Sequence, residues 1–208
     1  MNSKRVLYLV IGILFFLIFI VTFKVVTNSR IYIDEFAYSV LVDGIRNPFV
    51  TLVMKFFTNF SNTITIILIA IILFLVINDK KVALLIPINL GLITIINQLL
   101  KYLFKRPRPV GFRLIDIGGY SFPSGHAMIS TAFYGLLIYI IYNRVKNYKL
   151  RVLLIILNLI VIFMVGVSRI YLGVHFCSDV IVGMSISVIY LILFVNFINR
   201  YCKFHKIT

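Results

Sequence analysis

The chain has 208 residues, 62% of them hydrophobic, and a formal net charge of +15. Soluble globular domains are only about 45–50% apolar, so this composition excludes that class and indicates an integral membrane protein. Positive charge can serve nucleic-acid binding, but here the Lys and Arg residues stand in short clusters between apolar runs. That pattern is typical of membrane topology signals, and we expect no nucleic-acid partner.

Six apolar runs are long enough, or nearly long enough, to cross about 30 Å of hydrocarbon. The first, residues 6–26, is longer than the core of a signal peptide and is not followed by a small-residue cleavage site, which predicts an uncleaved anchor. The pattern predicts an all-α fold, with residues 1–208 forming one polytopic domain of six transmembrane helices. The other five runs are residues 63–77, 82–100, 127–142, 152–167 and 180–198.

Six spans put both termini on one side of the membrane and the loops 27–62, 101–126 and 168–179 on the other. In the first of these loops, acidic and apolar residues alternate at roughly helical spacing, which predicts an interfacial helix ended by Asn47-Pro48. The side of the termini carries eleven Lys and Arg against one Asp, whereas the loop side carries ten against five acids. We therefore expect cytoplasmic termini and an extracytoplasmic face formed by the three loops.

One loop on the external face is strongly basic, although positive charge opposes translocation. It has Asp116 as its single acidic residue. We interpret the cluster as a binding site for an anion. Its basic residues are Lys101, Lys105, Arg106, Arg108 and Arg113.

The polar turn Pro123-Ser124-Gly125-His126 precedes the fourth apolar run. Pro123 cannot continue a helix, and Ser124 is a good N-cap, so His126 is expected in the first helical turn. Free backbone N–H groups and the helix dipole make such an N-terminus a natural anion cradle, and Gly125 allows close approach to the backbone. An ordinary capped helix start is the alternative.

His175 and Asp179 lie four residues apart, at the predicted start of the last span. This spacing suits a carboxylate that accepts the imidazole Nδ1–H and leaves Nε2 free as a nucleophile. A structural pair is the alternative, although ionisable groups at a membrane edge are costly without a function. Two histidines and one acid are a poor metal-ligand set, so we expect neither a metal nor another cofactor.

Three stretches together resemble the signature of the phosphatidic acid phosphatase type 2 superfamily, with a match at every fixed position. The first is Lys-x6-Arg-Pro, matched by Lys101 and Arg108-Pro109. The second is Pro-Ser-Gly-His, matched by residues 123–126. The third is Ser-Arg-x5-His-x3-Asp, matched by Ser168, Arg169, His175 and Asp179.

This resemblance implies a metal-independent phosphatase with a phosphohistidine intermediate. It implies that His175 attacks phosphorus, Asp179 stabilises the resulting imidazolium and His126 protonates the leaving oxygen. It also implies a set of phosphate-binding residues: Lys101, Arg108, Ser124, Gly125 and Arg169.

The apolar surroundings favour a lipid phosphate or pyrophosphate as the substrate, within the bilayer and at its outer leaflet. The short chain, the outward site and a composition typical of bacteria favour undecaprenyl pyrophosphate, with phosphatidylglycerophosphate or phosphatidic acid as alternatives. Vanadium haloperoxidases share the constellation but are soluble. A transporter without chemistry is a further alternative, but nearly all spans lack charges within them. The sequence indicates no oligomeric state.

Overall fold

We describe residues 3–201 of the protein from a computed structural model. Residues 1–2 and 202–208 lie outside the described part, and with them Lys203 and Lys206 of the basic tail. All regular structure in residues 3–201 is helical, which confirms the predicted fold class. The elements are α1 (Ser3–Val26), α2 (Tyr32–Tyr38), a wider π-helical turn η1 (Ser39–Gly44), α3 (Pro48–Asn59), α4 (Thr63–Val76), α5 (Lys80–Phe104), α6 (Gly125–Arg144), α7 (Tyr148–Tyr171) and α8 (Cys177–Tyr201).

Five of these helices, α1, α5, α6, α7 and α8, are individually long and apolar enough to cross a membrane. Helix α4 has 14 residues and is only about 21 Å long, too short to span alone. Together with α3 it passes the same test as a pair bent by 50° at a short break. The predicted second span is present as α4, and α3, which the sequence analysis assigned to the external loop 27–62, is a separate helix that adds apolar length to it across the bend.

Polar residues at the edges of the apolar runs explain where the helices begin. At five N-caps a side-chain oxygen accepts a backbone N–H of the first turn and so pairs a donor that the helix leaves free. Pro48 at the first position of α3 fits the same geometry, because the missing N–H is not needed there. These caps are Asn47, Asn62, Asp79, Ser124 and Asn147.

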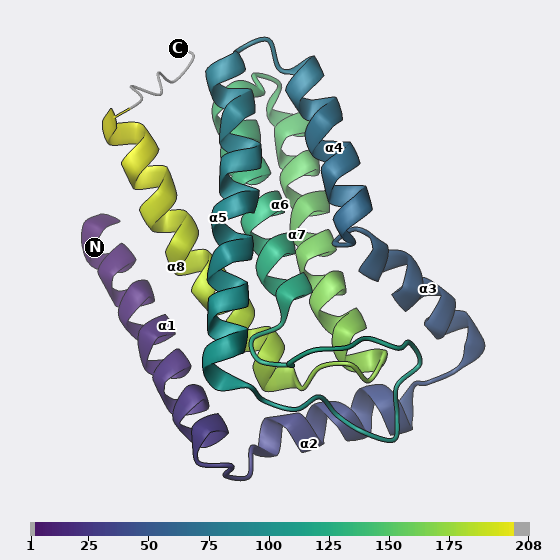
Figure 1. Cartoon of the computed structure of the whole chain (residues 1–208). Coiled ribbons are helices and arrows are strands. Elements are labelled where there is room, and N and C mark those ends of the chain that lie inside the picture. The colour runs from purple at the N-terminus through teal and green to yellow at the C-terminus, as the bar shows by residue number, and fades with distance from the viewer. Residues whose placement is uncertain (1–2, 202–208) are drawn as a thin grey trace.

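Helix α6 is the centre of the bundle, where it packs against α5, α7 and α8 (Figure 1). Its buried residues include Phe133 and Leu136, whereas α1 packs mainly on α8 and exposes most of its apolar surface. Large exposed side chains such as Phe19 and Phe163 cover the outside of the bundle. A surface of this kind is stable in lipid and costly in water, as expected for a membrane protein.

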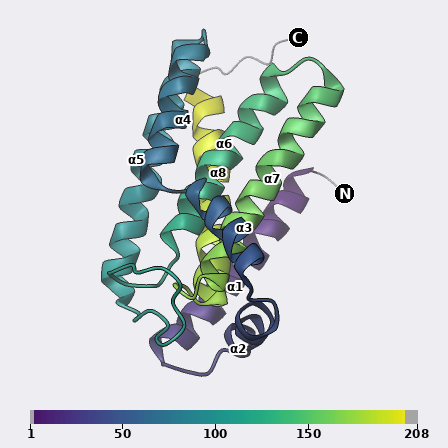
Figure 2. The same ribbon diagram turned by 90° about the vertical axis from the view of Figure 1, so that its right-hand side faces the viewer.

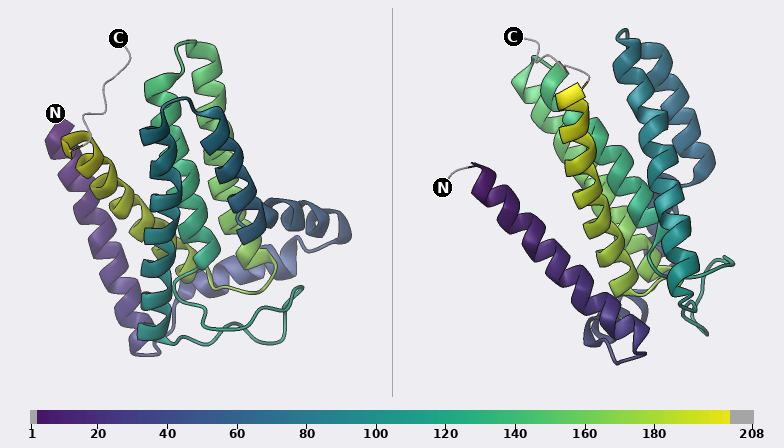
Figure 3. Two further views of the ribbon diagram at one scale, coloured as in Figure 1. Left: turned by 45° about the horizontal axis from the view of Figure 1, so that its top comes forward. Right: turned by 60° about the vertical axis from the view of Figure 1, so that its left-hand side comes forward.

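The connections that carry the three sequence motifs meet at one end of the bundle. The α5–α6 loop, the α7–α8 connection and the crosswise α2 lie at this end in two perpendicular views (Figures 1 and 2). The N-terminal end of α1 and the C-terminal end of α8 lie at the opposite end (Figure 3). Both described chain ends are therefore on the same side, as six crossings require.

Gly173 allows the α5–α6 loop to cross the α7–α8 connection closely. Its φ of +72° is a conformation that L side chains rarely adopt, and a Cβ there would lie 2.6 Å from the carbonyl oxygen of Phe112. The Leu114 N–H donates to the Leu172 carbonyl at 3.0 Å beside this crossing. The motif loops are thus held together by backbone contacts as well as by side chains.

The predicted orientation can be tested by cysteine labelling in a variant without Cys177 and Cys202. A cysteine at Gly118 fits without contact, since a Cβ there meets nothing within 4 Å. We expect Gly118→Cys to react with a membrane-impermeant maleimide in intact cells. Lys146→Cys, in the α6–α7 connection, is the matched control and should react only after permeabilisation. The reverse pattern would place the motif loops in the cytoplasm and contradict the charge-based orientation.

Candidate active site

His175 lies in the α7–α8 connection with a partner at each ring nitrogen. Its Nδ1 lies 3.3 Å from Asp179 Oδ2, and its Nε2 lies 3.0 Å from Arg108 Nη1. The guanidinium can only donate, so Nε2 must accept and the proton must be on Nδ1, where it is donated to Asp179. The contact that the four-residue spacing predicts is present, and the lone pair of Nε2 faces Arg108.

The surroundings of His175 keep its imidazole neutral. The side chain is almost completely buried, and burial lowers its pKa well below the usual 6.5; the positive charges of Arg169, Arg108 and Lys101 lower it further. Above that lowered pKa the ring carries no charge, so Nε2 stays unprotonated throughout the neutral range and its lone pair accepts only the hydrogen bond from Arg108. A neutral imidazole is the form that can act as a nucleophile.

Arg169, near the end of α7, is a buried cation with unused donors. Its residue is 1% exposed, and its Nη1 donates to Thr58 Oγ1 at 2.7 Å. Its Nε and Nη2 are buried without a hydrogen-bond partner among the described residues. Buried unpaired N–H groups are destabilising unless something accepts from them, and a phosphoryl oxygen is a strong acceptor. The unpaired donors of Arg169 are therefore suited to bind an anion.

Lys101 and Arg108 reach the same region from the end of α5 and the loop that follows. Helix α5 continues to Phe104, beyond the predicted end at residue 100, so Lys101 lies within its last turn. Lys101 Nζ donates to the Tyr120 carbonyl at 2.5 Å. Arg108 donates through Nε to the carbonyls of Gly118 and Gly119 and through Nη1 to that of Val174. These contacts fix both cations beside His175.

Ser124, Gly125 and His126 form the start of α6, as the sequence predicts. Ser124 is buried and its Oγ accepts the Ala127 N–H at 3.5 Å. A Cβ on Gly125 would lie 2.9 Å from Asn97 Oδ1, so glycine lets α5 and α6 approach here. His126 is within electrostatic range of Arg169 and His175, and its ring makes no hydrogen bond to the residues that the structure describes.

The structure adds two side chains that the sequence motifs do not mark, Thr58 and Asp34. Thr58 comes from α3 and binds Arg169, whereas Asp34 comes from α2 and binds Arg106 at 3.0 Å. Arg106 is therefore ion-paired with carboxylates of the protein itself. The prediction that the basic residues of this loop bind an anion is wrong for Arg106. Neither contact could be found in the sequence, because each joins segments far apart in the chain.

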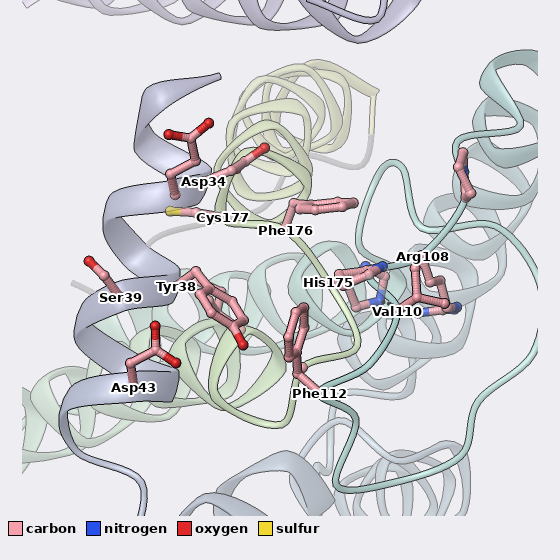
Figure 4. A pocket seen from close by; sticks show the side chains of 15 residues that line it. Asp34, Tyr38, Ser39, Asp43, Arg108, Val110, Phe112, His175, Phe176 and Cys177 are labelled. Carbon is pink, nitrogen blue, oxygen red and sulfur yellow. Dashed lines mark hydrogen bonds between the residues drawn. The ribbon is translucent and has the colours of Figure 1, made fainter. Parts of the chain in front are cut away.

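A cavity of about 670 Å³ opens beside His175 and extends towards α2 and η1 (Figure 4). Its wall is mostly apolar, although Asp43 and Ser39 stand at its η1 side. A volume of this order suits a small molecule or part of a lipid. Residues that form its apolar wall include Tyr38, Pro109, Val110, Phe112, Ile170 and Phe176.

The titratable groups of the site do not form an obvious metal centre. Within residues 3–201, no group of three or more His, Cys, Asp or Glu side chains is arranged to hold a metal ion. The positive charge at the site instead comes from Lys101, Arg108 and Arg169. These fixed cations and the α6 N-terminus can stabilise a phosphoryl group without proton exchange.

The fold and this site together define a polytopic helical membrane protein with a cationic, histidine-containing centre at one end of the bundle. The chain belongs to the PAP2 superfamily, whose model matches residues 82–202. Phosphatidylglycerophosphatase B of Bacillus subtilis (strain 168) is 31% identical over 113 residues, which are 54% of this chain. The aligned stretch spans 56% of that relative's length.

Two crystal structures share the fold. One is described as the first transmembrane PAP2 type phosphatidylglycerolphosphate phosphatase from Bacillus subtilis; it has a TM-score of 0.83 and 27% identity, covering 94% of this chain and 98% of that one. The other is Aquifex aeolicus LpxE, with a TM-score of 0.63 and 24% identity, covering 78% and 93%. The second likeness concerns the fold alone. The match to the PAP2 family model confirms the family that the sequence motifs resemble.

The two arginines of the site should not be replaceable by lysine. Lysine cannot reproduce the fork of N–H donors with which arginine contacts several oxygens at once. We expect Arg108→Lys and Arg169→Lys each to lower kcat/KM for a lipid phosphate by about 10- to 100-fold, the loss of one or two charge-assisted hydrogen bonds. Lys105→Arg is the control, because Lys105 is exposed, and it should change little. Equal losses in all three variants would argue against a phosphate clamp.

Thr58 should matter through its hydroxyl. Thr58→Val keeps the shape but leaves a third donor of Arg169 unpaired, so we expect kcat/KM to fall by about 10-fold. Thr58→Ser retains the hydroxyl and should stay within about threefold of the parent. The measurement is initial rates in detergent micelles with matched protein amounts. A similar loss in both variants would assign the role of Thr58 to packing of its methyl group.

Proposed function

We propose that this protein hydrolyses the terminal phosphate of a membrane lipid through a covalent phosphohistidine at His175. The observation that carries the proposal is that a neutral, buried imidazole lies within electrostatic range of a buried Arg169, whose Nε and Nη2 have no partner among residues 3–201. A phosphoryl group that accepts from Arg108 and Arg169 would lie next to Nε2. Family membership and the match to all three motifs support the same reaction.

In the first proposed step Nε2 of His175 forms a bond to phosphorus and the bond from phosphorus to the lipid oxygen breaks. A proton that enters with the substrate's phosphate passes through His126 to the departing oxygen, while Asp179 stabilises the phospho-imidazolium. In the second step water attacks phosphorus, His126 takes a proton from that water, and the N–P bond breaks. Lys101, Arg108, Arg169 and the N–H groups around Gly125 hold the equatorial oxygens in both steps.

For the substrate we favour phosphatidylglycerophosphate, because the Bacillus subtilis relative and the Bacillus subtilis crystal structure described above both carry that activity in their names. Undecaprenyl pyrophosphate, which the sequence favours, remains the second candidate, and phosphatidic acid the third. The apolar cavity beside His175 suits part of any of these lipids. The Lys and Arg distribution supports a site at the outer leaflet.

A substrate panel tests the activity. Purified protein is given phosphatidylglycerophosphate, undecaprenyl pyrophosphate and phosphatidic acid, and phosphate release is measured with and without a chelator. We expect the highest kcat/KM for phosphatidylglycerophosphate and no effect of chelation, because no step uses a metal. If a chelator abolished activity and added metal restored it, the mechanism would be contradicted. A higher kcat/KM for undecaprenyl pyrophosphate would instead support the substrate that the sequence favours.

Brief exposure to a labelled substrate with a good leaving group separates the roles of the two histidines. His175→Ala should carry no acid-labile, base-stable label and lose activity by on the order of 10³-fold or more. His126→Ala should still be labelled, because such a leaving group needs little protonation, and should retain the label longer since hydrolysis lacks its base. Asp179→Asn should be labelled slowly. Label on the His175→Ala variant would identify another nucleophile.

A further inference from the structure

Behind the His175–Asp179 pair lies an ion-pair chain that the three sequence motifs do not include. Asp179 is fully buried and uses its two oxygens for different partners. Oδ2 faces His175 Nδ1 and accepts the Phe176 N–H at 2.9 Å. Oδ1 accepts from Arg106 Nη1 at 2.6 Å. The carboxylate is thus held from the side opposite to the imidazole by a residue of the α5–α6 loop.

The guanidinium of Arg106 is held at both terminal nitrogens and on one face. Nη1 also donates to Ser178 Oγ at 2.8 Å, Nη2 donates to Asp34 Oδ2 at 3.0 Å, and the group lies over the Phe176 ring, 4.0 Å from its centroid. Only 15% of the side chain is exposed. An arginine with this many directed contacts has little rotational freedom, so it can set the direction of the Asp179 carboxylate.

Asp34 connects α2 to the first turn of α8. Its Oδ1 accepts the Ser178 N–H at 2.7 Å, and its Oδ2 accepts from Ser178 Oγ at 2.7 Å and from Arg106. It therefore satisfies a free N–H at the start of the helix that carries Asp179. Its side chain is only 9% exposed, so the ion pair with Arg106 is weakly screened by solvent.

The charges of this chain explain why two carboxylates are present. Arg106 alone would neutralise Asp179 and leave no net charge to stabilise an imidazolium on His175. With Asp34 included, the three groups carry one formal negative charge in total, and the cation still holds Asp179 in place. The arrangement combines a fixed carboxylate with a net negative field at the ring, both of which favour the phospho-imidazolium.

We propose that Arg106 and Asp34 are positioning residues that act on His175 through Asp179; this inference rests on the proposed phosphohistidine reaction. Arg106 does not line the cavity; Asp34 does, but both of its carboxylate oxygens are bound to Ser178 and Arg106, so neither residue needs to bind the phosphoryl group for this role. Their loss should lower the rate of phosphoryl transfer and leave substrate binding nearly unchanged. That separates them from Arg108 and Arg169, whose loss should weaken phosphate binding as well.

The test is a double-mutant cycle read by the rate of label transfer to His175 and by kcat and KM separately. We expect Arg106→Ala and Asp34→Asn each to lower kcat and the labelling rate by about 10- to 100-fold, with KM within about threefold. Arg106→Lys should recover part of the loss, because one cation can still pair with Asp179. Asp116→Asn is the control, since Asp116 is an exposed carboxylate of the same loop, and it should match the parent.

The decisive comparison is made in the Asp179→Asn background, where the proposed route of action is already lost. In that background Arg106→Ala and Asp34→Asn should each lower kcat and the labelling rate by less than about threefold. Losses as large as in the parent, or a rise in KM with unchanged kcat, would overturn the proposal. If Arg106→Ala does not fold, Asp34→Asn completes the cycle alone. If the parent protein releases phosphate without label on His175, the proposed phosphohistidine reaction itself is refuted. If the parent is labelled normally but the losses of kcat in the double variants are additive, only this inference is refuted.

Discussion

The structure depends on the concentration of positive charge around a buried, neutral histidine. Lys101, Arg108 and Arg169 all act on His175, and two buried nitrogens of Arg169, Nε and Nη2, have no hydrogen-bond partner in the described residues. Burying unpaired cationic donors is costly, and the rest of the bundle must supply the stability that offsets this cost. A bound phosphoryl anion would relieve both the mutual repulsion and the unpaired donors, so the same strain that destabilises the free site favours its ligand.

Rigid elements hold these charges in place. Lys101 lies in the last turn of α5, Arg169 near the end of α7 and Asp179 in the first turn of α8. The Ser124 N–H donates to the Asp179 carbonyl at 3.0 Å, which fixes the start of α6 against that of α8. A site assembled from helix ends in a packed bundle has less freedom than one built on loops, and phosphoryl transfer depends chiefly on such positioning.

The crosswise segment of α2 and η1 connects the apolar cavity with the ion pairs behind His175. It forms one side of the apolar cavity through Tyr38, and through Asp34 it contacts Arg106 and the first turn of α8. A lipid in the cavity would therefore contact the same helix that carries Asp34. The bend between α3 and α4 has a comparable position, since Thr58 beside it supports Arg169.

The sequence by itself determined the helical membrane class, the Ser124 cap at the start of α6 and the residues of the three motifs, because apolar run length, N-cap chemistry and motif spacing are local properties. The four-residue spacing also predicted the His175–Asp179 contact, although His175 lies in the connection before α8 and the two residues do not share a helical turn. Only the tertiary structure decided that α3 and α4 form one bent pair, that Arg106 pairs with carboxylates and that Thr58 and Asp34 join the site. The contacts of Arg106, Thr58 and Asp34 join residues 72 to 144 positions apart. The packing of distant helices, and not a local sequence pattern, decides which of these residues meet.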